Sequence, residues 1–176
     1  MQKSIATYLL CFILINLSAQ AQRKVSSYLN VQYSKTMYDR TIGNNPWGTG
    51  IGLQTFFNNS TKFKPTIELT AAIYLEDDKV YRMNADGTPI DAVEGMVNLL
   101  AGTSYTTTQN ISFSIVGGPS FINGQTLLGI KPSVGFYFSK SKRGTFNIAY
   151  LNVFNRDRVT KQDFGSVCLS LGIKLF

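Results

Sequence analysis

The residue types that most often do chemistry are scarce in this chain. It has 176 residues and no histidine, and its two cysteines are Cys11 and Cys168. Histidine is the commonest general base and metal ligand, so its absence excludes Ser-His-Asp and Cys-His catalytic arrangements. Cys168 lies between two apolar residues with no activating partner nearby in the sequence, and we interpret it as an interior filler. The sequence therefore predicts a protein that is not an enzyme.

Two further patterns resemble ligand sites, and each has a simpler interpretation. Gly48-Thr49-Gly50-Ile51-Gly52 resembles a phosphate-binding loop, but no helix follows it, so we expect a strand packed closely inside a narrow barrel. A long connection carries oxygen ligands suited to Ca²⁺, but their spacing is not that of an EF-hand, and a solvated loop is the favoured interpretation. Those oxygen ligands belong to Glu76, Asp77, Asp78, Asn84, Asp86 and Asp91. We expect no metal and no cofactor.

Three charged residues are more informative, because they fall on the small or polar side of alternating segments. They are Glu68, Lys131 and Lys174. If that side faces a packed interior, an unpaired charge there is costly. We therefore predict an interior charge network in which Glu68 pairs with at least one of the two lysines.

The elements that would position these residues alternate between apolar and polar residues, which is the pattern of strands with two unlike faces. Eight such segments follow one another, and no stretch of helical period stands between them. The segments are 26–36, 48–58, 64–76, 96–106, 111–118, 126–139, 145–155 and 166–176. The sequence thus predicts an all-β fold, an eight-stranded antiparallel up-and-down barrel.

The connections between these segments alternate in length, and the third, residues 77–95, is the longest. We expect long links at 37–47, 77–95, 119–125 and 156–163, and short links at 59–63, 107–110 and 140–144. Long loops at one end and short turns at the other are typical of transmembrane barrels.

The composition of the polar face decides between a membrane barrel and a soluble one. Charged residues make up 15% of the chain, against about 25% in soluble domains. The polar face is rich in Gly, Ser, Thr, Asn and Gln, which suit a narrow filled interior, and each segment is long enough to cross a bilayer. Aromatic girdles are expected where strand ends face lipid. The candidate girdle residues are Tyr28, Tyr33, Tyr81, Tyr105, Phe146 and Phe154.

The first 21 residues predict a secretory signal peptide: Lys3, an apolar stretch and Ala19-Gln20-Ala21 as a cleavage site. Residues 22–176 would then form the barrel domain, with Cys168 as its one cysteine and no intramolecular disulfide. Without Lys3 the chain has 16 basic and 10 acidic residues, a charge of +6. Export makes a nucleic-acid partner improbable, and anionic lipid or polysaccharide head groups are the expected neighbours.

Residues 26–176 resemble the small eight-stranded outer-membrane β-barrels of the OmpA/OmpX type and the PorT-like barrels of Bacteroidetes. The resemblance rests on the eightfold pattern and on the terminal Phe176. It implies that Phe176 is an assembly signal for the barrel-assembly machinery, that outer-membrane lipid and lipopolysaccharide surround a monomer, and that the PorT-like members act in secretion. Phe176 departs from the family, because in the alternation it falls on the same side as Lys174 rather than on the apolar side. A bulge or terminal fraying would move its side chain to the other face.

We therefore expect a non-enzymatic protein of the cell outer membrane with a side-chain-filled interior. Its role would lie in long extracellular loops, in adhesion, envelope integrity or assistance to secretion. One alternative is a soluble exported lipocalin-like barrel with Ile73, Ile130 and Leu171 inside, binding an apolar ligand. Others are a narrow outer-membrane pore and a membrane-barrel or lipid-modifying enzyme, which the lack of histidine disfavours.

Overall fold

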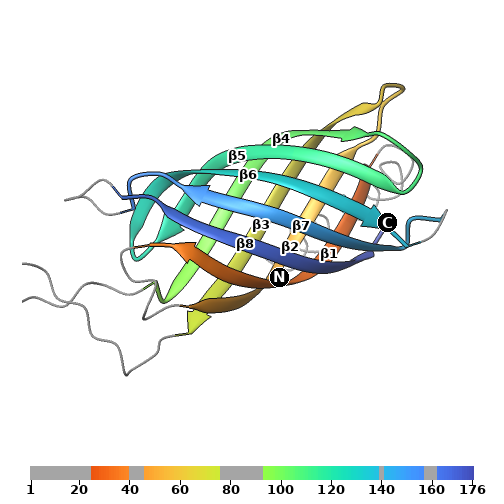
Figure 1. The fold of residues 1–176 in the computed structure, drawn as a ribbon. Coiled ribbons are helices and arrows are strands. Elements are labelled where there is room, and N and C mark those ends of the chain that lie inside the picture. The colour runs from red at the N-terminus through yellow and green to blue at the C-terminus, as the bar shows by residue number, and fades with distance from the viewer. Residues whose placement is uncertain (1–24, 40–45, 76–92, 139–140, 157–161) are drawn as a thin grey trace, which may run out of the picture.

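The computed structural model describes residues 25–39, 46–75, 93–138, 141–156 and 162–176. They form eight antiparallel strands, each paired with its neighbours in sequence, and β8 pairs with β1 to close the barrel (Figure 1). The strands are β1 (Val25–Tyr38), β2 (Trp47–Phe57), β3 (Phe63–Leu75), β4 (Gly95–Thr106), β5 (Ile111–Ile122), β6 (Gln125–Tyr137), β7 (Gly144–Val153) and β8 (Phe164–Lys174). The predicted eight-stranded antiparallel barrel is confirmed. The predicted signal peptide, residues 1–21, lies outside the described residues.

The side chains of each strand alternate between the lumen and the outer wall, because successive residues of a strand point to opposite faces. On β3, Ile73 is 65% exposed while the next residue, Tyr74, is 3% exposed. Leu171 on β8 is 59% exposed. The lipocalin-like alternative requires Ile73 and Leu171 inside, so this arrangement excludes it.

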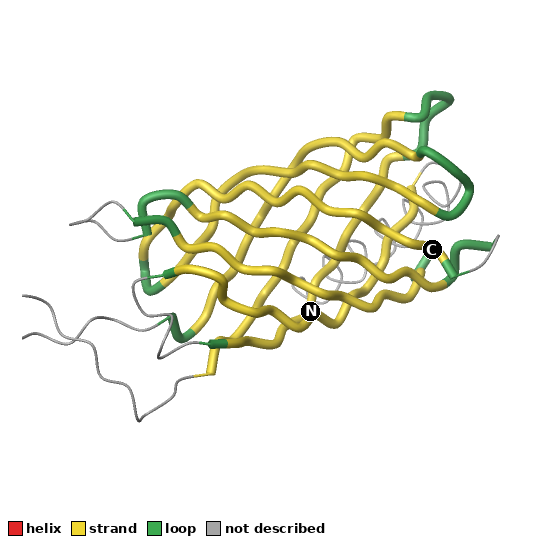
Figure 2. Tube along the Cα trace, viewed as in Figure 1, coloured by secondary structure: helices red, strands yellow, loops and turns green. Residues whose placement is uncertain are grey.

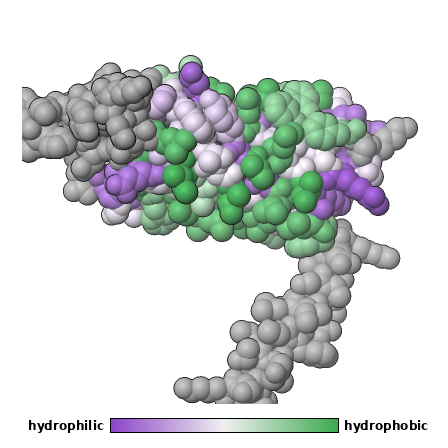
Figure 3. All heavy atoms as spheres, turned by 90° about the horizontal axis from the view of Figure 1, so that it is seen from below, coloured by the Kyte–Doolittle hydropathy of each residue, from purple (hydrophilic) through white to green (hydrophobic). Residues whose placement is uncertain are grey.

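The outer wall is apolar over its middle and carries aromatic pairs towards both ends, as the girdle interpretation predicts. Figure 3 shows hydrophobic side chains over much of one face of the barrel and hydrophilic side chains gathered towards its two ends. Near one end the rings of Tyr33 and Trp47 stack at 5.9 Å. Near the other, Phe63 contacts Tyr105 at 4.8 Å and Phe136 contacts Phe146 at 6.4 Å. Among the described residues no helix is long and apolar enough to cross a membrane.

The connections divide the barrel into two ends (Figure 2). We call the inner end the one that holds the start of β1, the end of β8 and the turns at 58–62, 107–110 and 138–143. The outer end holds the other four connections. As predicted, the short turns lie at the inner end, and the connections of the outer end are longer, with one exception.

The expected long link at 119–125 is wrong, because β5 continues to Ile122. Asn123 and Gly124, with φ of 46° and 71°, alone join β5 to β6. Two consecutive residues of positive φ make a tight hairpin turn that matches the twist of the strands. The Gly117-Gly118-Pro119 stretch looked like a strand end, but Ser120 and Ile122 resume the buried phase beyond it.

The glycine run on β2 explains how closely β2 and β3 pack. A Cβ on Gly50 would lie 2.3 Å from the Ala71 carbonyl oxygen, and one on Gly48 would lie 2.9 Å from the Tyr74 ring. Only hydrogen fits these positions, as expected for a strand in a narrow barrel. The run is structural and leaves room inside for Tyr74.

Candidate functional site: the filled lumen

The lumen holds three layers of side chains along the barrel axis. A polar layer at mid-height lies between two apolar groups, which we name the outer plug and the inner plug after the ends they occupy. Its members come from six strands, because each contributes inward residues at that height. The polar layer includes Asn30, Gln54, Glu68, Thr70, Lys131, Asn147 and Ser170.

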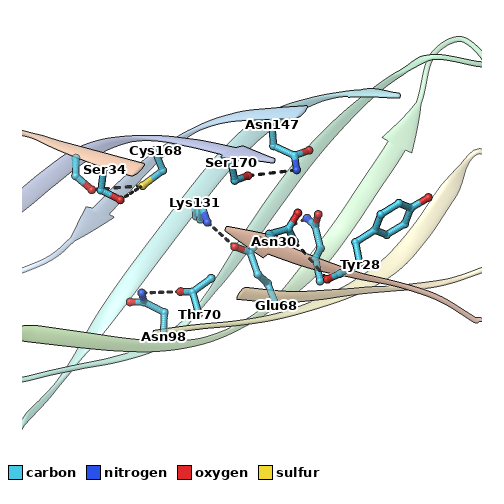
Figure 4. A network of polar contacts seen from close by, with 12 residues as sticks. Tyr28, Asn30, Ser34, Glu68, Thr70, Asn98, Lys131, Asn147, Cys168 and Ser170 are labelled. Atoms are coloured by element: carbon cyan, nitrogen blue, oxygen red, sulfur yellow. Dashed lines mark hydrogen bonds and ion pairs between the residues drawn. The ribbon is translucent and has the colours of Figure 1, made fainter. Parts of the chain in front are cut away.

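Glu68 of β3 and Lys131 of β6 form an ion pair in the polar layer (Figure 4). Their exposures are 5% and 7%. Gln54 Nε2 also donates to Glu68 Oε2 at 3.4 Å, so both carboxylate oxygens have a partner. An opposite charge in direct contact offsets the desolvation that burial imposes on each group. The predicted pairing of Glu68 with a lysine is present, and the lysine is Lys131.

Lys174 does not join this pair, contrary to the predicted three-residue network. It lies on the inward phase of β8, but it pairs with Tyr28 at the inner end, where its side chain is exposed. The alternation of inward and outward residues along β8 correctly predicted that Lys174 lies on the inward side. Lys174 and Glu68 lie at different heights along the barrel axis, and the alternation of a strand does not encode that height.

Neutral hydrogen bonds complete the polar layer. Asn98 Nδ2 donates to Thr70 Oγ1 at 2.9 Å, and Asn147 Nδ2 donates to Ser170 Oγ at 3.4 Å (Figure 4). The cavity left among these side chains measures about 10 Å³, which is room for roughly one water molecule. The layer is therefore filled by protein atoms.

The outer plug closes the lumen towards the long connections. Phe164 is fully buried, and its ring meets that of Tyr74 edge-on at 5.3 Å. The larger side chains of the plug are Tyr74, Val93, Met96, Ile122, Leu151, Val153 and Phe164. Beside it, Arg156 Nε lies 3.6 Å from Asp39 Oδ1, and both side chains are at least nine-tenths buried. The alternation of the sequence could not reveal this pair, because each residue lies just beyond the end of a strand.

The inner plug closes the opposite end with three aromatic rings: Tyr28, Phe56 and Tyr137. The Tyr28 ring meets Phe56 edge-on at 5.7 Å and lies 6.0 Å from Tyr137. Tyr28 was a candidate for the lipid-facing girdle, and that prediction is wrong, because its phase on β1 is inward and it is 2% exposed. Tyr33, Tyr105 and Phe146 do lie on the outer wall. Tyr81 lies outside the described residues.

The lumen also holds the cysteine of the barrel. Cys168 is 2% exposed and accepts a hydrogen bond from Ser34 Oγ at 3.3 Å, as expected of an interior filler. Within the part of the chain that the structure describes, no three Asp, Glu, Cys or His side chains gather as metal ligands. The acidic residues from Glu76 to Asp91 lie outside that part.

Phe176 continues the pairing of β8 with β1 beyond the strand proper. The Leu175 amide donates to the Ser27 carbonyl at 2.8 Å, and the Ser27 amide donates to the Phe176 carbonyl at 3.1 Å. Leu175 and Phe176, just beyond the end of β8, thus both oppose Ser27 of β1, which is the pattern of a β-bulge. Phe176 is 46% exposed. Such a bulge offsets the alternation by one residue, so the position of Phe176 in the alternation does not by itself set the face of its ring. Its role as an assembly signal stays a prediction.

No family model and no curated protein matches the chain. Solved structures do. The outer-membrane protein Ail of Yersinia pestis in a phospholipid nanodisc has a TM-score of 0.55 at 12% identity, covering 85% of this chain and 99% of Ail. A crystal structure of the same protein, the attachment invasion locus protein, gives 0.53 at 10% identity, covering 86% and 98%. The chain therefore has the fold of a small outer-membrane barrel. An outer-membrane location follows from this fold together with the apolar outer wall.

Proposed function

We propose that this protein is a non-enzymatic, sealed barrel of the outer membrane that works through its outer connections. The observation that carries the proposal is the filled lumen: two apolar plugs enclose a polar layer whose cavity is about 10 Å³. A solute cannot pass such an interior without displacing buried side chains, which disfavours the narrow-pore alternative. The absence of histidine from the whole sequence supports a non-enzymatic role.

With transport disfavoured, contact at the outer end is the remaining means of action, in adhesion, envelope integrity or assistance to secretion. The last of these would follow the PorT-like resemblance. Ail carries attachment in its name, and one of its crystal structures holds the heparin analogue sucrose octasulfate. In this chain nine of the ten acidic residues fall in the outer connections, against six basic ones. That charge favours a neutral or cationic partner surface over a polyanion.

The membrane-facing partners in this proposal are lipid and lipopolysaccharide around the outer wall, and the barrel-assembly machinery at the exposed end of β8. Exposed apolar residues on every strand support the first. The exposed Phe176, still paired to β1, supports the second. One barrel closes its own sheet, so the proposed state is a monomer.

The test combines three measurements on the full chain. A folded membrane barrel should resist detergent unboiled and shift its gel mobility on boiling. In planar bilayers the purified protein should give no single-channel currents. An epitope inserted after Asp86 should be labelled on intact cells, and the same epitope inserted after Ser141 should be labelled only after lysis. Recovery in the soluble fraction without detergent, or stable single-channel currents, would overturn the proposal.

A further inference from the structure

The charge of the two ends is opposite. The strand ends and turns of the inner end contain no Asp or Glu in residues 25–29, 55–67, 103–115, 133–147 and 171–176. Among the described residues they carry five basic side chains: Lys62, Lys64, Lys142, Arg143 and Lys174. The side chains described at the inner end thus form a cationic surface with no carboxylate side chain among them.

Three of these lysines surround the mouth of the lumen. Lys64 and Lys174 lie on the inward phases of β3 and β8. Lys142 comes from the turn between β6 and β7, and its Nζ lies 4.8 Å from the centre of the Tyr137 ring. Tyr28 Oη donates to the Lys142 carbonyl at 3.0 Å, which ties this turn to the inner plug. We name Lys64, Lys142 and Lys174 the cationic mouth.

The mouth is held in place by neutral contacts. Lys64 Nζ donates to Asn58 Oδ1 at 3.0 Å, and the Lys174 amide donates to the Arg143 carbonyl at 2.8 Å. Lys142 has a φ of 53°, a backbone conformation that glycine adopts more readily than lysine. Partial burial and the neighbouring Lys174 lower the pKa of Lys142. None of the three lysines has an ion pair within the described residues. Among the described residues these like charges therefore stay together without an Asp or Glu side chain to offset their repulsion.

The position of the mouth determines which anion fits it. Head groups of the surrounding lipid lie beside the outer wall, whereas these lysines belong to the inward phases and the turn over the plug. A partner approaching along the barrel axis meets all three, with Lys174 exposed and the other two half-buried. Carboxylates spaced along an extended peptide suit separate lysines better than one compact anion does.

We propose that the cationic mouth binds an acidic segment of a periplasmic protein. The orientation, with the inner end towards the periplasm, rests on the proposed function. The barrel would then present its outer connections on one side of the membrane and hold a periplasmic partner on the other.

The test uses the full barrel in phosphatidylcholine nanodiscs and a fluorescent twelve-residue peptide of alternating Glu and Ser. Fluorescence anisotropy should report binding that weakens with salt, and a Gln-for-Glu peptide should not bind. The variant Lys64→Gln/Lys142→Gln/Lys174→Gln should lose about tenfold in affinity, since three solvent-accessible ion pairs contribute that order together. Replacing the same three lysines by Arg should retain binding.

The matched control is Lys35→Gln, which removes a lysine from the outer wall near Trp47 and should leave affinity unchanged. Equal binding by the triple Gln variant, or an equal loss in Lys35→Gln, would overturn the inference. So would lysine-dependent association with phosphatidylglycerol vesicles in the absence of any peptide binding, since the ligand would then be a lipid phosphate. Heat-modifiable migration of each sample separates the two proposals: a sample without it refutes the membrane barrel, and a shifting sample that ignores the peptide refutes only the docking site.

Discussion

Lys131→Met removes the ammonium group from the polar layer and leaves the Glu68 carboxylate without its ion pair. Glu68 is 5% exposed, and its remaining described partner is Gln54 at 3.4 Å. Removing one member of a buried ion pair lowers the free energy of unfolding by about 3–5 kcal/mol, because the other charge is left desolvated. If Lys131 faced lipid instead, the same change would stabilise the protein.

The double variant Glu68→Gln/Lys131→Met separates pairing from mere loss of polarity. Replacing both members of a buried pair by neutral groups of similar size is often neutral or stabilising. We therefore expect the double variant to be more stable than Lys131→Met alone. Lys62→Met, on an exposed turn residue, serves as the control and should change stability by no more than about 0.5 kcal/mol.

The assay is urea unfolding in phosphatidylcholine vesicles, followed by the fluorescence of Trp47. The chain has one tryptophan, and it is 40% exposed on the outer wall. Its emission should change when the barrel leaves the lipid. A free energy of unfolding of Lys131→Met within about 1 kcal/mol of the parent would contradict the buried ion pair. So would a double variant whose loss equals the sum of the losses in Lys131→Met and Glu68→Gln measured singly.

Three other predictions follow from the same structure. Phe164→Ala should lower the free energy of unfolding by about 3–5 kcal/mol in the same urea assay, because it empties the centre of the outer plug; a loss below about 1 kcal/mol would mean that the plug is not packed. Gly50→Val should lower the temperature at which the unboiled band is lost on gels, because its Cβ would lie 2.3 Å from a β3 carbonyl, and an unchanged temperature would contradict that contact. Burial and the neighbouring Lys174 lower the pKa of Lys142 below its ordinary 10.5 in the folded state. The folded protein therefore loses the Lys142 proton at a lower pH than the unfolded chain does, so the free energy of unfolding rises as pH approaches 10.5. Urea titrations at alkaline pH should show a smaller rise in Lys142→Gln, and the same dependence on pH in both proteins would contradict this prediction.

The number of strands, the closure of the sheet and the residues that share each face could all be predicted from the sequence. Alternation has a period of two, as does the strand, so Ile73 and Leu171 could be assigned to the apolar face. The small, uncharged residues of the opposite face then favoured lipid as the neighbour of the apolar face, and the structure places both residues on the outer wall. The charges of Glu68 and Lys131 could be assigned to the lumen by the same rule. The alternation failed at the end of β5, where glycine and proline interrupt it, and at the bulges near Tyr38 and Phe176.

Which inward residues contact one another could be known only from the folded barrel. Parity gives the side of a strand but not the height along a tilted barrel, which depends on the register of all eight strands together. Register brings Glu68 level with Lys131 and leaves Lys174 at the inner mouth. It also turns Tyr28 into part of a plug, because its inward ring meets rings from β2 and β6. Pairings set by the summed offsets of several strands cannot be read from any one of them.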